Sequence, residues 1–162
     1  MKKYFSLIAA ASLGAIVSGV VVKKVWLEKY RRQRVELELM EQEREVLRIW
    51  LQTKYEGSEC TAMLFDKGYQ KVAILGMNWE GRLLANVLGN TAVYGVEQDN
   101  FGAIHPRLIV YRLGEDILPP ADCLVVCDLK NLPEKLELAK REFKGEIITL
   151  MQMLEGTLEQ HQ

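Results

Sequence analysis

The sequence has few of the residues that build metal centres, disulfide frameworks or a strong electrostatic field. Its 162 residues include three cysteines, two histidines and four prolines, and the formal net charge is −1. Cys60, Cys123 and Cys127 contain no CxxC pair, and their odd number does not fit a disulfide framework. With only His105 and His161 to add, the sequence predicts no metal site. The near-neutral charge also gives no reason to expect a nucleic-acid partner.

Charged residues are missing from residues 4–22, which are bounded by pairs of lysines. A hydrocarbon core of about 30 Å needs roughly 20 helical residues, so this run can cross a membrane. A cleaved signal peptide is the alternative, but its apolar stretch is shorter and ends at small residues. This run ends on three valines and then lysines. The sequence therefore predicts an uncleaved, single-pass anchor over residues 1–24.

Basic residues follow the apolar run and predict its orientation. Residues 23–34 hold six Lys or Arg and one Glu, which is typical of a membrane flank. The positive-inside rule places the following domain in the cytoplasm at the cell membrane, where reduced, buried Cys123 and Cys127 are expected. Ser12, Ala15 and Gly19 share one face of the anchor, and whether they form a helix dimer is left open.

Glycine and proline are absent from residues 25–55, which predicts a helical stalk. Two interpretations remain open. The first is a coiled coil, whose heptad seam would contain Leu37, Met40, Leu47 and Leu51, with Trp26 and Tyr30 in register upstream. The second, which the interruptions by Gln33 and Arg44 favour, is a solvated helix whose last turns pack on the domain through Val46, Leu47, Trp50 and Leu51.

An α/β domain is expected over residues 56–155, followed by a tail over 156–162. A short helix capped by Ser58 ends near Gly68. Five apolar runs then predict strands, at residues 71–75, 92–96, 108–111, 123–127 and 147–150. Helical segments follow the first and fourth runs, which favours a mostly parallel sheet. The second, first and fourth strands should be adjacent, in that order.

The turn after the first strand, Gly76-Met-Asn-Trp-Glu-Gly81, resembles a known fingerprint. With the acidic Glu97 about 20 residues on, residues 71–99 resemble the opening unit of the Rossmann-like NAD(P)/nucleotide-binding superfamily. Residues 50–154 resemble the small domains found beside bacterial cell-surface polysaccharide and nucleotide-sugar enzymes. The resemblance implies a cofactor site, for NAD(P) or a nucleotide-sugar, formed by Gly76, Asn78, Trp79, Gly81 and Glu97.

Asn78 departs from that fingerprint, because it stands where the second glycine lets a pyrophosphate approach the backbone. A left-handed Asn78 would preserve the turn, but its side chain would occupy the phosphate position, and Trp79 adds bulk there. The sequence therefore favours a degenerate site without a bound cofactor. Glu97 would bind a ribose, with Asp99 as a less well placed competitor, or would be a solvated strand end.

Catalytic chemistry has little support. His105 lies on a predicted loop without an assignable partner, and Asp128, after the fourth strand, would either face a ligand or cap the next turn. No P-loop, nucleophile elbow or Tyr-x-x-x-Lys pair is present. The sequence favours a protein that is not an enzyme.

The connections between the second and fourth strands are too short for full crossover helices, and Pro119-Pro120 interrupts one of them. An incompletely covered sheet face is expected, which predicts a protein partner or a homo-oligomer. The favoured function is a membrane-anchored binding or scaffolding module. The resemblance and the anchor together suggest a role in bacterial cell-envelope polysaccharide assembly. The alternatives are a small nucleotide-sugar-dependent or oxidoreductase-like enzyme, and a purely structural homo-oligomer.

Overall fold

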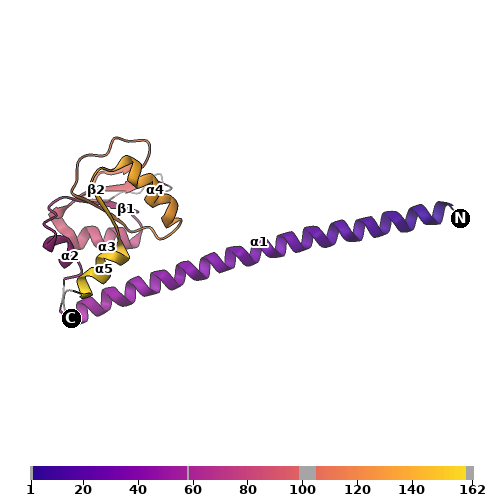
Figure 1. The fold of residues 1–162 in the computed structure, drawn as a ribbon, viewed down its shortest axis with the longest axis horizontal. Coiled ribbons are helices and arrows are strands. Elements are labelled where there is room, and N and C mark those ends of the chain that lie inside the picture. The colour runs from indigo at the N-terminus through magenta and orange to yellow at the C-terminus, as the bar shows by residue number, and fades with distance from the viewer. Residues whose placement is uncertain (1, 58, 99–104, 160–162) are drawn as a thin grey trace. The chain divides into compact units, whose positions relative to one another are not determined.

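The protein is described by a computed structural model that covers residues 2–57, 59–98 and 105–159, with side chains from residue 23 onward. The chain forms two compact units, Met1–Glu41 and Gln42–Gln162. The first unit is entirely helical where it is described, and the second contains the α/β domain (Figure 1).

Helix α1 runs from Lys2 to Tyr55, so it ends where the stalk was expected to end. In the first unit, the large apolar side chains Trp26, Tyr30, Leu37 and Met40 are all exposed. Leu37 and Met40 belong to the predicted heptad seam, and Trp26 and Tyr30 are in register with it. The coiled coil stays a prediction, because one chain alone cannot test it.

The predicted membrane anchor at residues 4–22 lies outside the part of the chain whose side chains are described. Within the described part of the chain, no helix combines the length and the apolar character needed to cross a membrane. The anchor therefore also stays a prediction.

The last turns of α1 pack into the second unit with a different face from the one expected. Val46, Ile49 and Trp50 are buried, whereas Leu47 and Leu51 are 43% and 62% exposed. The prediction was right for Val46 and Trp50 and wrong for the two leucines. Residues three and four apart share one helix face, so burial of Val46 and Trp50 selects Ile49 and turns the leucines outward.

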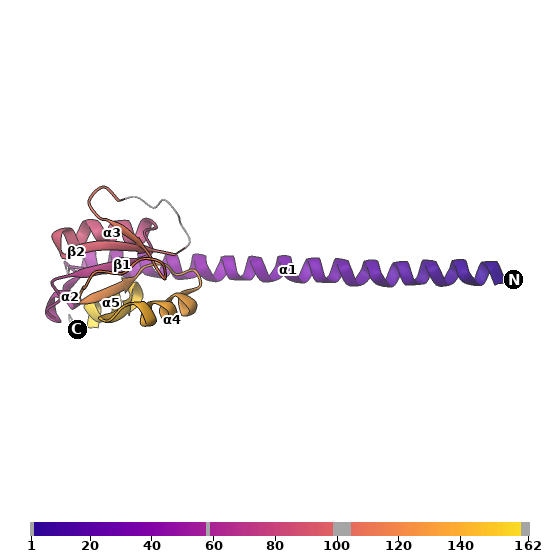
Figure 2. The same cartoon turned by 90° about the horizontal axis from the view of Figure 1, so that it is seen from above.

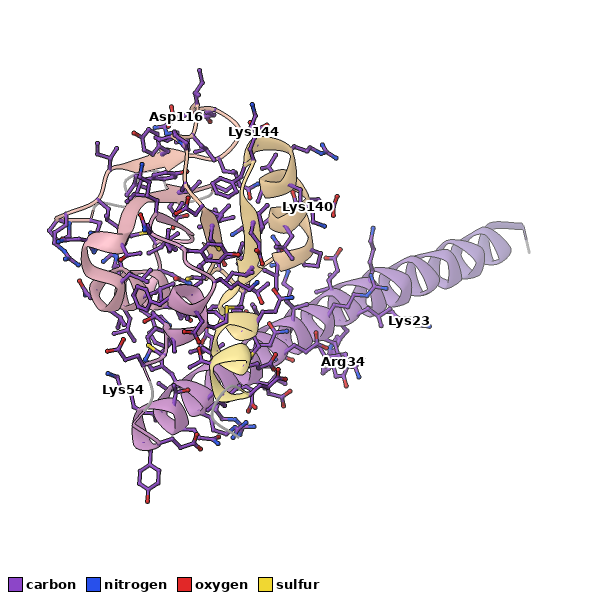
Figure 3. The ribbon with its side chains drawn as sticks, turned by 60° about the vertical axis from the view of Figure 1, so that its left-hand side comes forward. Lys23, Arg34, Lys54, Asp116, Lys140 and Lys144 are labelled. Carbon is purple, nitrogen blue, oxygen red and sulfur yellow. The ribbon has the colours of Figure 1, made fainter. Side chains whose placement is uncertain are left out.

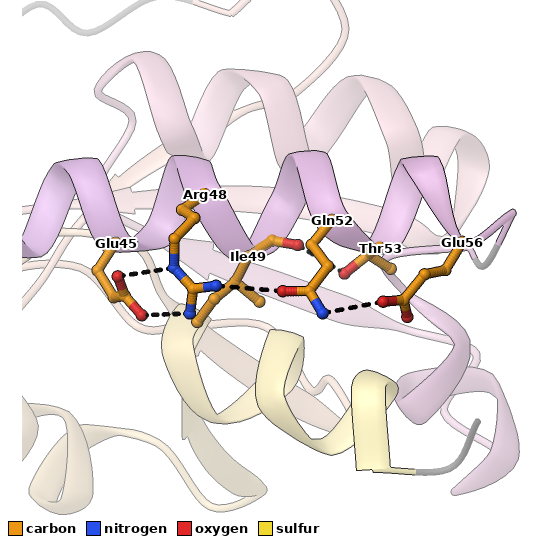
Figure 4. A network of polar contacts seen from close by, with 6 residues as sticks. All are labelled: Glu45, Arg48, Ile49, Gln52, Thr53 and Glu56. Carbon is orange, nitrogen blue, oxygen red and sulfur yellow. Dashed lines mark hydrogen bonds and ion pairs between the residues drawn. The ribbon is translucent and has the colours of Figure 1, made fainter. Parts of the chain in front are cut away.

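The outward side of the same turns carries a chain of polar contacts (Figure 4). Arg48 donates to Glu45 and to Gln52, and Gln52 donates in turn to Glu56. On the buried side, the Thr53 hydroxyl donates to the Ile49 carbonyl at 2.8 Å, which satisfies a polar group inside the core. The last turns of α1 therefore have one face buried in the domain and polar contacts on the other face.

The second unit is built on a five-stranded, all-parallel sheet in the order β3-β2-β1-β4-β5. This is the strand order expected for a Rossmann-like sheet, and the predicted neighbours are confirmed. The strands are β1 (Val72–Leu75), β2 (Ala92–Glu97), β3 (Val110–Arg112), β4 (Cys123–Val126) and β5 (Glu146–Thr149).

Helices cover both faces of the sheet (Figure 2). Gly81 of α3 packs against Ile74, whereas Ala139 of α4 clusters with Ala73 and Leu75. Successive residues of a strand point to opposite faces, so α3 and α4 lie on opposite sides of β1. The helices and the 3-10 turn of this unit are α2 (Ala62–Asp66), α3 (Trp79–Leu88), η1 (Gly89–Thr91), α4 (Leu132–Glu142) and α5 (Leu150–Glu159).

Several expected boundaries need correction. The third strand begins at Val110, and Leu150 belongs to α5 and not to the fifth strand. Helix α5 continues to Glu159, so residues 156–159 are helical and not a tail, because the buried Thr157 hydroxyl contacts the carbonyls of Cys60 and Met153. Helix α2 begins after Thr61, later than the expected Ser58, which lies outside the described residues.

The expected uncovered sheet face is not found over the central strands. Strands β1 and β4 are buried along their whole length, and only the edge strands are partly exposed. A loop replaces the missing crossover helix, because Leu113, Leu118 and Ala121 pack against the core cluster. The Tyr94 hydroxyl donates to the Pro119 carbonyl at 2.6 Å and fixes this loop in place.

Candidate functional site

The candidate site lies where β1 and β4 end. The chain leaves β1 toward β2 on one side and leaves β4 toward β5 on the other, so the strand order reverses here. Open α/β sheets bind their ligands outside the carboxyl ends of the strands at such a reversal. The predicted turn from Gly76 to Gly81 follows β1, and Asp128 follows β4, so the structure brings these two segments together.

Close packing accounts for both glycines of the turn. Gly76 has a φ of +92°, and a Cβ atom there would lie 2.6 Å from the Cβ of Asp128. A Cβ on Gly81 would lie 1.9 Å from the Gly76 carbonyl oxygen. Both distances are too short for any side chain, so the fold requires glycine at these positions whether or not a ligand binds.

Asn78 does not adopt the expected left-handed conformation. Its φ and ψ are −67° and −166°, because the positive φ of the turn falls on Gly76 instead. Asn78 is the N-cap of α3, and its Oδ1 accepts from the Gly81 N–H at 3.1 Å. Its Nδ2 donates to the Cys127 carbonyl at 3.5 Å, so the side chain reaches from β1 toward β4.

Glu97, at the end of β2, is buried and is not the solvated strand end considered above. Its Oε1 accepts from the Met77 N–H of the turn at 2.5 Å. Burial raises the pKa of this carboxyl, while the Met77 bond and the charge of Lys135 lower it. Its alternative, Asp99, lies outside the described residues.

Glu80 is a buried carboxyl group that the sequence reasoning missed. It is only 1% exposed, and its Oε2 has no hydrogen-bond partner among the residues that the structure describes. Burial raises the pKa of Glu80 to about 6, and the negative charges of Glu43 and Asp128 add to this shift. An acidic residue in the first turn of a helix is normally solvated, so the local pattern did not indicate burial.

Lys135, in the first turn of α4, was also missed. Its side chain is 3% exposed, and its Nζ donates to Asp128 Oδ2. The other carboxylate oxygen of Asp128 accepts from the Lys130 N–H at 2.9 Å, so Asp128 does cap the turn that follows β4. A lysine on an otherwise amphipathic helix normally faces solvent, which hides its role from the sequence.

Among the described residues, Glu80, Glu97 and Asp128 bring carboxyl groups to the carboxyl end of the sheet, and Lys135 brings an ammonium group. Glu80, Glu97 and Asp128 gather near the amino end of α3, where the helix dipole favours negative charge. Trp79 lies beside them in the first turn of α3 and is 46% exposed. The Met77 N–H and the Lys135 ammonium could bind an anion, but they interact with the carboxylates of Glu97 and Asp128.

His105 is buried beside two arginines. Its Nδ1 accepts from the Arg107 N–H at 3.3 Å, and burial, with Arg107 and Arg82 nearby, lowers its pKa. Arg82 donates to the Met77 carbonyl, and Arg107 donates to the Ala85 carbonyl and the Asn86 amide. No carboxylate is hydrogen-bonded to His105 among the described residues, so the geometry supports a structural histidine.

The cysteines are unpaired in the structure. Cys60, Cys123 and Cys127 are free and buried, and burial raises the pKa of each thiol, that of Cys123 to about 12. Raised thiol pKa values reduce the thiolate fraction and hence the reactivity. Within the described part of the chain, no three His, Cys, Asp or Glu residues are grouped as a metal site would require.

A hollow of about 540 Å³ lies away from this site, where the chain enters β4 and β5. It is lined by the loop over residues 114–121 and the turn over residues 142–145. Asp116 and Lys144 mark these two segments in Figure 3.

Comparisons of the chain with models of protein families, with curated proteins and with solved structures find no match. The strand order, the glycine turn and the buried charges are therefore the features that bear on function.

Proposed function

We propose that this chain is a membrane-anchored, Rossmann-like binding or scaffolding module whose nucleotide site is degenerate. The observation that carries the proposal is that the glycine turn is hydrogen-bonded to the protein's own side chains. Glu97 accepts from Met77 N–H, and Asn78 accepts from Gly81 N–H. In a dinucleotide site, the acidic residue would contact the ribose and the start of the helix would contact the phosphate.

The charges around the turn also oppose a nucleotide. A pyrophosphate at the start of α3 would lie among Glu80, Glu97 and Asp128, and the nearby ammonium of Lys135 is already bound to Asp128. Like charges in a buried site raise the free energy of binding. The residues present therefore do not fit NAD(P) or a nucleotide-sugar.

The proposed location at the membrane is inferred from the N-terminal region. The uncharged run at 4–22 and the basic flank at 23–34 support a single-pass anchor with the α/β domain in the cytoplasm. The role in bacterial cell-envelope polysaccharide assembly is inferred from the resemblance and the anchor together. The protein should sediment with membranes and stay there after a carbonate wash. A soluble form that begins near Val20 would contradict the anchor.

Ligand binding provides the direct test. The full chain in detergent is titrated with NAD(P) and with UDP-, GDP- and dTDP-sugars, by calorimetry and by thermal shift. We expect no binding, whereas a ligand at 100 times its Kd would stabilise the domain by about 2.7 kcal/mol. Asn78→Gly removes the obstructing side chain and is the variant in which weak binding would appear.

Glu97→Ala distinguishes the two interpretations. If no ligand binds, the change leaves the Met77 N–H without its acceptor and costs about 1–3 kcal/mol in the free energy of unfolding, with or without nucleotide present. Micromolar binding by the wild type that is lost in Glu97→Ala would overturn the proposal in favour of a nucleotide-dependent enzyme.

A structural homo-oligomer is the second candidate, favoured by the exposed apolar side chains of the first unit. Trp26, Tyr30, Leu37 and Met40 are all exposed on α1. Sedimentation in detergent should then show a discrete oligomer that Leu37→Glu dissociates. A monomeric wild type would reject this candidate.

A further inference from the structure

A buried carboxyl group lies where α3 begins beside the last turns of α1. The two neighbouring charges that act on Glu80 come from Glu43 of α1 and from Asp128 after β4. Both are negative, and Glu80 in turn acts on the buried Cys127 thiol. The ammonium nearest to Asp128 belongs to Lys135, which is bound to that aspartate. Figures 1 and 4 show the last turns of α1 beside α3 and α5.

The unpartnered oxygen decides which form of Glu80 this packing favours. Glu80 Oε2 has no hydrogen-bond partner in the described part of the chain. A hydrogen bond from its own backbone N–H favours the ionised form of Glu80, but burial of a carboxylate with an unpartnered oxygen outweighs that bond and favours the neutral carboxyl group. The contact between α3 and α1 is therefore compatible with a protonated Glu80 and is opposed by an ionised one.

We propose that Glu80 is a proton-controlled latch between α3 and α1. When Glu80 is protonated, the last turns of α1 stay packed through Val46, Ile49 and Trp50. When it is ionised, repulsion by Glu43 and Asp128 and the lost hydration favour opening of these turns. Because α1 joins the α/β domain to the first unit, the latch makes that connection sensitive to pH.

The direction of the effect follows from the pKa values. The pKa of Glu80 is about 6 in the folded protein, above the ordinary value of 4.5. Its stabilising contribution is complete below pH 4.5 and is lost as the pH rises through 6. A difference of this size corresponds to a change of about 30-fold in the opening equilibrium constant. The pKa of His105 is lowered, so its contribution is lost as the pH falls and has the opposite sign.

Native-state hydrogen exchange on the full chain in detergent tests the latch. The amides of residues 46–53 are followed between pH 4.5 and 7.5, and their rates are corrected for intrinsic exchange. In the wild type, the opening constant of these amides should rise about 30-fold with pH. Glu80→Gln imitates the protonated group and should remove this rise.

Two variants on α1 provide matched controls. Glu45→Gln changes a carboxylate that is exposed and paired with Arg48, and it should leave the full rise in place. Glu43→Gln removes one of the repelling charges and should reduce the rise without abolishing it.

Two results would overturn the latch. One is a rise of the same size in Glu80→Gln as in the wild type. The other is opening of the α1 amides only together with those of β1 and β4, which would mean that the turns never open separately. If Glu80→Gln does not fold, a carboxyl NMR titration of the wild type decides, and a Glu80 midpoint at or below 4.5 overturns the proposal.

Discussion

The two ends of the same sheet differ in how their space is filled. At the carboxyl ends of β1 and β4, the glycine turn, Glu97 and Asp128 interact with one another and with Lys135. Where the chain enters β4 and β5, the loops leave a hollow of about 540 Å³. At the end where open α/β sheets bind ligands, the described residues of the glycine turn are thus bonded to the protein's own side chains, whereas the hollow lies at the opposite end.

Local chemistry explains the difference. At the carboxyl end, glycines at positions 76 and 81 let helix α3 begin in direct contact with β1. At the entry to β4, Pro119 and Pro120 have no N–H groups to extend the sheet, so the chain runs as a loop. The Tyr94 hydroxyl anchors this loop at a single point. Four substitutions test whether the packed end and the hollow differ in stability as they do in structure.

Gly81→Leu should have the largest effect. The new Cβ would lie 1.9 Å from the Gly76 carbonyl oxygen, so α3 must move away from β1. We expect a loss of about 3 kcal/mol or more in the free energy of unfolding, measured by urea denaturation with or without nucleotides. Gly156→Ala is the control, because its Cβ would meet only the flexible side chain of Met63, at 3.1 Å. Equal losses in both variants would show that the glycine turn is not specially packed.

Lys135→Ala should rank second. It removes the partner of Asp128 from a buried ion pair, and an uncompensated buried charge costs about 3–5 kcal/mol when neither group is exposed. Asp128 is 20% exposed, so we expect the lower end of this range. The double variant Lys135→Met with Asp128→Asn should recover part of the loss. A double variant that is less stable than Lys135→Ala would show that the pair is not the source of the effect.

Asn78→Ala should cost about 1 kcal/mol, because it removes the acceptor that caps the Gly81 N–H at the start of α3. Asn78→Gly should cost only a few tenths of a kcal/mol, since glycine is tolerated at an N-cap. Thermal denaturation of both variants measures the difference. A fully stable Asn78→Ala variant would mean that the side chain does not support the packed end.

Ile117→Asp, in the hollow, should have the smallest effect. Ile117 is 95% exposed, so the change should alter the free energy of unfolding by less than about 0.5 kcal/mol. The urea midpoint of this variant is compared with that of the wild type. A loss above about 1 kcal/mol would make the hollow part of the core, and the contrast between the two ends would disappear.

Much of the fold could be predicted from the sequence because its signals are local. The apolar runs that became β1, β2 and β4 are short and follow turn-forming residues, which are Gly68, Asn90 and Pro120, and the turn at Gly76 places a helix directly after a strand. Together with right-handed crossovers, these signals predicted the neighbours β2, β1 and β4. The missing crossover helices were also predicted, but not the loop through Leu118 that covers the sheet in their place.

The sequence predicted where the site lies in the fold, but it did not predict how the side chains of the site interact. The sequence identified Gly76, Asn78, Gly81 and Glu97, and the structure brings all four to the ends of β1 and β2. The left-handed conformation considered for Asn78 is not found, because a pattern of residue types does not say which position of the turn takes the positive φ. The burial of Glu97 depends on Met77 folding back toward β2.

The sequence by itself determined the order of the elements and the apolar runs that form the sheet. It also determined the positions of Gly76 and Gly81, where the chain packs too closely for a side chain. Tertiary structure alone decided which charged side chains are buried. Glu80 and Lys135 occupy helical positions at which such residues normally face water. Both side chains are buried, because α1 and the ends of β2 and β4 pack around them. The hydration of a side chain depends on neighbours that are distant in sequence, whereas helix and strand patterns are read from neighbours a few residues away.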